Sequence, residues 1–210
     1  MTDHEARQLL DRAAAASANS TRRKLLLAAA FSSVALDNAV MVGGVAVEVH
    51  TGSYAPTDID LVGRRRRGHQ RVLDGLGFDR DGRHWLYTFP DGETLAIEVP
   101  GDQLGDFATD PPVAIDLEPG RLSVIALNDL MMDRLLQATG GESVTLEEAV
   151  RLAVATYQRI GWDDLDARAR TAAVDGSFAG KALGDVVARV RREARQRLRA
   201  ARQADHNSAP

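Results

Sequence analysis

The hydrophobic pattern of this sequence changes near residue 126, and the change restricts the fold class. Before that point, apolar residues cluster or alternate as in short strands, at 38–42, 58–62, 85–89, 94–99 and 121–125. After it, apolar residues recur at helical spacing, in 127–138, 146–159, 163–173 and 181–202. Two further helical ranges, 3–16 and 22–36, precede the first strand. We therefore expect an α+β protein with a small mixed sheet, N-terminal helices and a helical C-terminal part.

The same pattern predicts how the chain is organised. Residues 1–125 should form an α/β core with N-terminal helices, residues 126–205 a helical part packed on it, and residues 206–210 a frayed tail. Within the core, the first strand ends at Gly43-Gly44, and a short helix and a turn-rich loop follow before the strand at 58–62. The strands at 85–89 and 94–99 should form a hairpin.

Composition excludes several classes of protein. The chain has no cysteine, which excludes disulfides, thiolate zinc sites and a cysteine nucleophile. Its first residues lack the pattern of a signal peptide, and the apolar run at 25–31 is far shorter than the roughly 20 residues that cross a bilayer. We therefore expect a cytoplasmic protein that does not span a membrane.

Charge is distributed unevenly along the chain, although the net charge is only −4. Residues 91–120 carry eight acids and no lysine or arginine, whereas residues 181–210 carry eight bases against three acids. Because the C-terminal arginines alternate with apolar residues, we interpret this range first as an amphipathic helix docked on the protein and second as a contact for RNA or protein.

Three acids on expected strands form the strongest candidate site. In Asp58-x-Asp60 the two-residue period of a strand places both carboxylates on one side, where their repulsion is costly unless a cation lies between them. Glu98 supplies a third carboxylate if its strand pairs beside residues 58–62; Glu93 or Asp102 would take that place if the register differs. Hard oxygen ligands favour Mg²⁺ or Mn²⁺.

Gly43 and Gly44 could complete this site, because glycine lets backbone approach a phosphate and the following helix offers free N–H groups. Two cations about 4 Å apart could then hold a nucleoside triphosphate in line with an attacking hydroxyl. Ser53 and Thr57, in the loop before the strand, could bond phosphate or ribose, although such residues commonly serve the local backbone. The arginine run at 64–67 could steer triphosphate or RNA, although a solvated surface is the commoner role of such a run.

In the order of these motifs the sequence resembles the nucleotidyltransferase superfamily related to DNA polymerase β. The resemblance covers residues 38–160 and lies in the order hG-G, spacer, D-h-D-h, h-E-h. The segments VMVGGVAVEVHTGSYAPTDIDLV, GFDRDGRHW and VIALNDLMMDRLLQA look similar to small prokaryotic stand-alone members, including relatives of AbiEii-type toxins. The resemblance implies a minimal palm with appended helices, in which Asp58, Asp60 and Glu98 bind metal and Gly43 and Gly44 face the phosphates.

The resemblance also implies an activity, namely metal-dependent transfer of a nucleoside monophosphate to an acceptor hydroxyl on RNA such as tRNA, on a protein or on a small molecule. Many members have serine at the position of Gly44, and toxin-like members carry a lysine and an aspartate where this chain has Arg134 and Thr145. These departures favour the alternative, a weakly active or inactive binding module of the same fold, such as an antitoxin or regulator. The oligomeric state and the preferred nucleotide do not follow from the sequence.

Overall fold

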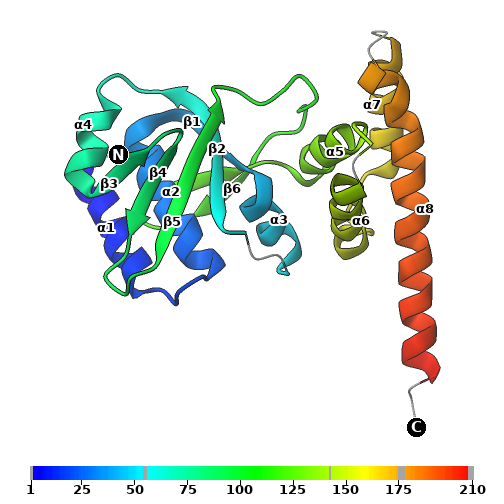
Figure 1. Ribbon diagram of the computed structural model, residues 1–210, viewed down its shortest axis with the longest axis horizontal. Coiled ribbons are helices and arrows are strands. Elements are labelled where there is room, and N and C mark those ends of the chain that lie inside the picture. Colours follow the sequence, from blue (N-terminus) through cyan, green and yellow to red (C-terminus); the bar gives the residue numbers. More distant parts are fainter. Residues whose placement is uncertain (1, 54–55, 142, 175–177, 208–210) are drawn as a thin grey trace. The chain divides into compact units, whose positions relative to one another are not determined.

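A computed structural model describes residues 2–53, 56–141, 143–174 and 178–207 (Figure 1). The chain divides into two compact units, which we call the sheet unit (Met1–Asp106 with Pro111–Ala126) and the helical unit (Phe107–Asp110 with Leu127–Pro210). The helices of the sheet unit are α1 (Asp3–Ala15), α2 (Thr21–Ala35), α3 (Gly43–Thr51) and α4 (His69–Leu76). Its strands are β1 (Leu36–Val42), β2 (Asp58–Arg65), β3 (Phe78–Asp81), β4 (His84–Thr88), β5 (Thr94–Gly101), β6 (Val113–Asp116) and β7 (Arg121–Val124). The helical unit contains α5 (Leu127–Ala138), α6 (Ser143–Thr156), α7 (Trp162–Val174) and α8 (Phe178–Asn207).

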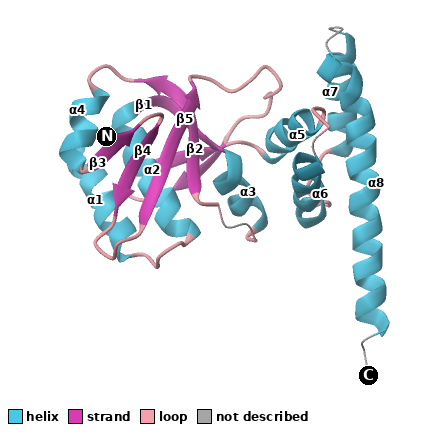
Figure 2. Cartoon of the chain, in the orientation of Figure 1, coloured by secondary structure: helices cyan, strands magenta, loops and turns pink. Residues whose placement is uncertain are grey.

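The sheet is mixed, as predicted, and the fold class is α+β (Figure 2). Its seven strands lie in the order β3-β4-β5-β2-β1-β7-β6. β2 runs parallel to β5, and β1 runs parallel to β7, while the other neighbours are antiparallel. The hairpin of β4 and β5 and the pairing of β5 beside β2 are therefore confirmed, and β2 lies in the middle of the sheet.

Two edge strands do not follow from the hydrophobic pattern. In β3 only Phe78 is buried, and β6 has no buried residue, so neither shows the alternation of a half-buried strand. Each instead pairs along its length with an antiparallel neighbour, β4 and β7 respectively. Backbone hydrogen bonding to a neighbour, rather than side-chain pattern, determines these short strands.

Helix α2 packs against the sheet and is buried over most of its length. It contacts β1, β2 and β7, and its apolar residues from Leu26 to Ala30 are fully buried. Ser20 caps its first turn, because the Ser20 side chain accepts a hydrogen bond from the Arg23 backbone N–H at 3.2 Å. A helix that is apolar on nearly all sides belongs in a core rather than at the surface.

A buried ion pair joins α2 to α3. The Lys24 side chain is only 1% exposed, and its ammonium lies 3.1 Å from Glu48 Oε2. The other oxygen, Glu48 Oε1, accepts a hydrogen bond from Thr21 Oγ1 at 2.6 Å. With both oxygens of Glu48 bonded, the charges are compensated within the core, and α3 is held at a fixed position on α2.

Arg23 holds the turn between β4 and β5. Its guanidinium is buried, lies 2.7 Å from Asp91 Oδ2 and 2.5 Å from Glu93 Oε2, and lies over the ring of Phe89. It also donates to carbonyl oxygens near the end of α1, those of Ala13, Ala14 and Ala16. Two of the eight acids in residues 91–120 are therefore used to bind a structural arginine.

The helical unit includes four residues that precede the last two strands, Phe107–Asp110. Asp129 on α5 is fully buried and accepts hydrogen bonds from the backbone N–H groups of Thr109 and Asp110, at 3.1 and 3.0 Å, and from Arg168 on α7 at 2.5 Å. This carboxylate joins the segment to α5 and α7. Helix α8 continues through residues 206 and 207, which the sequence places in a frayed tail; residues 208–210 lie outside the described residues. Among the helices of the described residues, none is long and apolar enough to cross a bilayer.

Glu147 on α6 makes the helical unit sensitive to acid. Its carboxylate accepts two hydrogen bonds from Arg197 on α8, at 2.8 and 2.6 Å, and one from Arg151 at 3.0 Å. These bonds lower the pKa of Glu147 from 4.5 to about 2. Because the folded-state pKa is the lower one, the ion pairs contribute their full stability above pH 4.5 and lose it as the pH falls through about 2.

We expect an NMR titration of the Glu147 side chain to give a pKa of about 2 in the wild-type chain. In Arg197→Gln the pKa should move up toward its ordinary value, because the hydrogen bonds from Arg197 are the largest cause of the shift. An unchanged pKa in this variant would contradict the assignment.

Candidate active site

The backbone of β2 and β5 places three acids on one face of the sheet. In the parallel register, Asp60 lies opposite Glu98 and Asp58 opposite Ala96. Ile59, between the two aspartates, is fully buried on the other face, whereas Asp58, Asp60 and Glu98 are partly exposed. Glu98, rather than Glu93 or Asp102, is thus the neighbour of Asp60.

Gly43 lies directly against the Asp60 carboxylate. β1 ends at Val42, which pairs with Asp60, and α3 begins at the next residue. Gly43 has φ +63°, and a Cβ built on it would lie 1.9 Å from Asp60 Oδ2 and 2.8 Å from Asp60 Cγ. Only glycine fits this position, both for its backbone conformation and for the space available. The two motifs of the sequence thus meet at one contact, and Gly44 follows as the second residue of α3.

Gly43→Ala should destabilise the chain and displace the Asp60 carboxylate. The methyl group adds a steric conflict to the left-handed backbone strain, so we expect a loss of about 1–3 kcal/mol in the free energy of unfolding. Gly52→Ala is the matched control, because Gly52 has φ +69° but nothing within 4 Å of its Cβ position. Urea unfolding of both variants measures the difference; equal losses would show that the contact with Asp60 does not matter.

The Glu98 carboxylate contacts two side chains outside the aspartate pair. Glu98 Oε1 lies 3.3 Å from Arg83 Nε, and Glu98 Oε2 lies 3.4 Å from His84 Nε2. His84 reaches it because β4 and β5 pair with His84 opposite Glu98. Within the described parts of the chain, no group of three or more histidine, cysteine, aspartate or glutamate residues has the geometry to hold a metal ion.

The aspartate pair nevertheless fits a hard divalent cation by donor type and position. Asp58 and Asp60 offer carboxylate oxygens on one partly exposed face, the ligands that Mg²⁺ and Mn²⁺ prefer. Glu98 can join them only by leaving His84 and Arg83, and the Arg83 side chain is 74% exposed. An ion pair with so exposed an arginine is worth about 0–1 kcal/mol, so its exchange for a cation costs little.

The contact of Glu98 with Arg83 and His84 was not predicted, although the sequence contains a signal for it. The expected strands at 85–89 and 94–99 pair Trp85 with Ile97. Extending that register by one residue places His84 opposite Glu98. Antiparallel partners point to the same face, so the carboxylate has a neighbour on each side of β5, Asp60 and His84.

The remaining candidates lie beside β2 or at its far end. The Ser53 backbone N–H donates to Thr51 Oγ1 at 3.3 Å, and Thr57 is exposed immediately before Asp58. Their contact with a nucleotide stays a prediction. The arginine run at 64–67 lies at the opposite end of β2 from the aspartates, where Arg64 and Arg66 form ion pairs with Asp37 at 3.2 and 2.9 Å. Arg134 and Thr145 lie on α5 and α6 of the helical unit.

No protein-family model matches the chain, and no curated protein sequence matches it. Among solved structures, an antigenic nucleotidyltransferase-like protein from Paracoccidioides brasiliensis has a TM-score of 0.46 and 13% identity, over 74% of this chain and 76% of that one. The antibiotic-resistance factor ANT(2'')-Ia has a TM-score of 0.35 and 18% identity, over 98% of this chain and 100% of that one. Similarity at this level assigns no activity, and it does not test the expected relation to AbiEii-type toxins. A proposal for the function therefore depends on the residues of the chain itself.

Proposed function

We propose that the chain is a nucleotidyltransferase dependent on Mg²⁺ or Mn²⁺, which transfers a nucleoside monophosphate from a nucleoside triphosphate to an acceptor hydroxyl. The observation that carries the proposal is the meeting of Asp58, Asp60 and Glu98 on one face of β2 and β5, with Gly43 against Asp60. A carboxylate pair beside a glycine turn and a helix start brings ligands for a cation next to N–H groups for phosphate.

In this proposal the residues of the chain have separate roles. Asp58 and Asp60 hold the cation, and Glu98 either joins them or accepts the proton of the acceptor hydroxyl. A bound cation would neutralise charge on the triphosphate and on the leaving pyrophosphate. The first turn of α3 has no hydrogen bond from a side chain at its N-cap. In the proposal, N–H groups of this turn donate to phosphate oxygens. The acceptor oxygen bonds the α-phosphorus, the bond from that phosphorus to pyrophosphate breaks, and the hydroxyl proton leaves to Glu98 or to water.

The test is transfer of label from each α-³²P-labelled nucleoside triphosphate, with Mg²⁺ or Mn²⁺, to total RNA, to protein or to small hydroxyl compounds. Asp58→Asn and Asp60→Asn should each slow transfer by at least about 10³-fold, because several kcal/mol of transition-state stabilisation depend on the cation. EDTA should abolish transfer. Asp79→Asn is the control, because Asp79 is an exposed acid on β3. Transfer that survives in the Asp60 variant, or that falls equally in the control, would contradict the proposal.

A second function is favoured by the ion pair of Glu98. If Arg83 and His84 hold that carboxylate permanently, the site keeps only two acids, and the chain would act as a nucleotide-binding or protein-binding module such as an antitoxin or regulator. Nucleotide binding without label transfer distinguishes this function from the first. Releasing Glu98 by Arg83→Gln should then restore some transfer in the same assay.

The resemblance to toxins adds a narrower proposal, that the enzyme acts in the cytoplasm as part of a toxin–antitoxin system. Expression in a bacterial host should then arrest growth, and Asp60→Asn should relieve the arrest. Growth that is equally slow with both forms would contradict the toxin role without affecting the transfer chemistry.

A further inference from the structure

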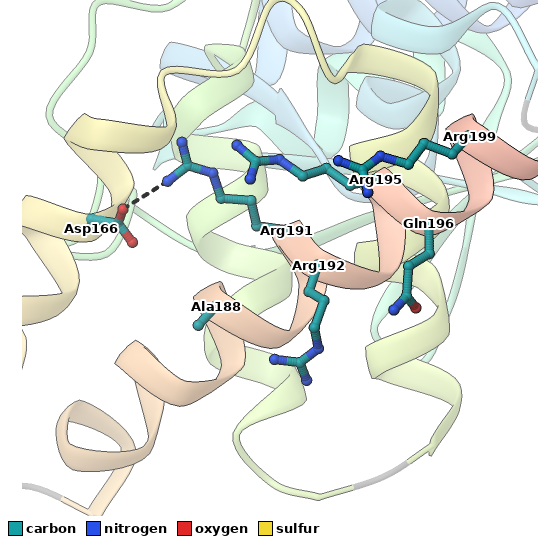
Figure 3. Close-up of a pocket in the computed structure, with 7 residues that line it drawn as sticks. All are labelled: Asp166, Ala188, Arg191, Arg192, Arg195, Gln196 and Arg199. Atoms are coloured by element: carbon teal, nitrogen blue, oxygen red, sulfur yellow. Dashed lines mark hydrogen bonds and ion pairs between the residues drawn. The ribbon is translucent and has the colours of Figure 1, made fainter.

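A groove of about 500 Å³ in the helical unit lies along α8 and is lined mainly by arginine (Figure 3). Arg191, Arg192, Arg195 and Arg199 come from α8, and Asp166 comes from α7. Figure 3 shows the side chains of Arg191, Arg195 and Arg199 extending to one side of α8 and that of Arg192 to the other, with Asp166 bonded to Arg191. The expected C-terminal helix is thus confirmed, and part of its charge is gathered in one place.

The arginines of the groove have different environments. The Arg191 guanidinium lies 3.1 Å from Asp166 and 3.8 Å from Asp163, and it stacks over the Trp162 ring at 5.5 Å. Arg191 is therefore a structural residue, and it neutralises Asp166. Arg192 and Arg199 are exposed, and neither forms an ion pair with any residue that the structure describes.

Three arginine positions form a row along α8. Arg192, Arg195 and Arg199 stand three and four residues apart, so their backbone positions lie on one face of the helix, although the Arg192 side chain extends to a different side from the other two (Figure 3). At 1.5 Å per residue the row spans roughly 10 Å, and exposed Arg202 continues it by about one further turn. The charge therefore extends along the helix as a line, longer than a single phosphate group needs.

Other arginines of α8 lie outside this row and are paired. Arg189 forms an ion pair with Glu193 at 2.8 Å, and Arg197 forms one with Glu147 at 2.6 Å. Arg195, within the row, donates to the Tyr157 hydroxyl through Nε, which leaves its terminal nitrogens for other partners. Positive charge without an acidic partner is thus concentrated along the groove.

We propose that this groove binds the sugar-phosphate backbone of RNA. A guanidinium donates two parallel hydrogen bonds to a phosphate, and a line of such groups matches a line of phosphates. Arg191 lies over the Trp162 ring and Arg195 over the Tyr157 ring, so a base cannot stack on these two ring faces. Binding should therefore be independent of sequence and dominated by charge. The choice of RNA over DNA rests on the proposed function, because RNA offers a 2′-hydroxyl acceptor on every nucleotide.

The test is fluorescence anisotropy of the full chain with a fluorescein-labelled RNA duplex of arbitrary sequence, at 50–200 mM KCl and without nucleotide or divalent cation. The triple variant R192Q/R195Q/R199Q should lose at least about 10-fold in affinity, and the slope of log K against log salt should fall by about 3. Arg191 is left intact because it is structural. Circular dichroism of both proteins shows that the fold is retained.

The matched control is R22Q/R71Q/R170Q, which removes the same charge from exposed arginines outside the groove. This control should bind RNA nearly as the wild type does. An equal loss of affinity in the control would show that net charge, rather than the groove, determines binding, and would overturn the proposal. Label transfer to a DNA duplex as fast as to an RNA duplex would overturn the choice of RNA, and equal displacement by polyglutamate would overturn recognition of phosphate. Asp60→Asn should bind RNA as the wild type does. If the wild-type chain binds RNA but transfers no label, that result contradicts only the proposed function.

Discussion

Replacing Lys24 by methionine should lower the free energy of unfolding by about 3–5 kcal/mol, because Glu48 would be left charged and without its cation inside the core. Urea unfolding followed by tryptophan fluorescence measures this loss. Glu48, the acid of this ion pair, lies on α3, the helix that begins with Gly43 and Gly44. The variant should therefore also weaken the proposed binding of a nucleotide.

A double variant that removes both charges of the Lys24–Glu48 ion pair tests whether the charges themselves are needed. In Lys24→Met combined with Glu48→Leu, both charges are replaced by apolar groups of similar size, and most of the lost stability should return. Arg22→Met is the control, because Arg22 neighbours Lys24 on α2 but is exposed, and it should leave stability nearly unchanged. A double variant no more stable than Lys24→Met would show that the charges themselves are needed.

Asp129→Ala should have a comparable effect on the helical unit, a loss of about 3–5 kcal/mol. The substitution leaves Arg168 without its buried acceptor and leaves two backbone N–H groups, those of Thr109 and Asp110, unsatisfied. Asp129→Asn keeps one acceptor oxygen and the shape of the side chain but removes the charge. Its loss of free energy of unfolding should therefore be smaller than that of Asp129→Ala.

Hydrogen exchange is the appropriate measurement, because it reports stability residue by residue. Protection should fall in α5 and α7 and in the segment Phe107–Asp110, and persist in the sheet. The fully exposed Asp163 on α7 supplies the control variant Asp163→Ala. A uniform loss over the whole chain would contradict a local role for Asp129.

Much of the sheet unit follows from the sequence, because its central strands are defined by apolar side chains. The alternation around Ile59 predicts which face of β2 carries the aspartates. The sequence leaves open whether Glu98, Glu93 or Asp102 lies beside them, because this depends on the register of β5 against β2. The edge strands β3 and β6 could not be predicted in this way, since their pairing depends on a neighbour rather than on their own pattern.

The candidate site was predictable in position but not in detail. Period two places Asp58 and Asp60 together, and the glycine pair marks the turn. The ion pair of Glu98 with Arg83 depends on side-chain directions that no one-dimensional pattern contains. The same holds for the groove on α8, where helical spacing predicts the row of arginines but not which of them are already paired.

Because of the contact between Gly43 and Asp60, the residues tolerated at one of these two positions depend on the residue at the other. A lineage that lost Asp60, and with it the bulk of the carboxylate, would be released from the steric half of the requirement for glycine. Only the φ of +63° would remain, and asparagine tolerates such a value better than other side chains do. Descendants that lack Asp60 should therefore carry paired substitutions at these two sites, which ancestral reconstruction could detect.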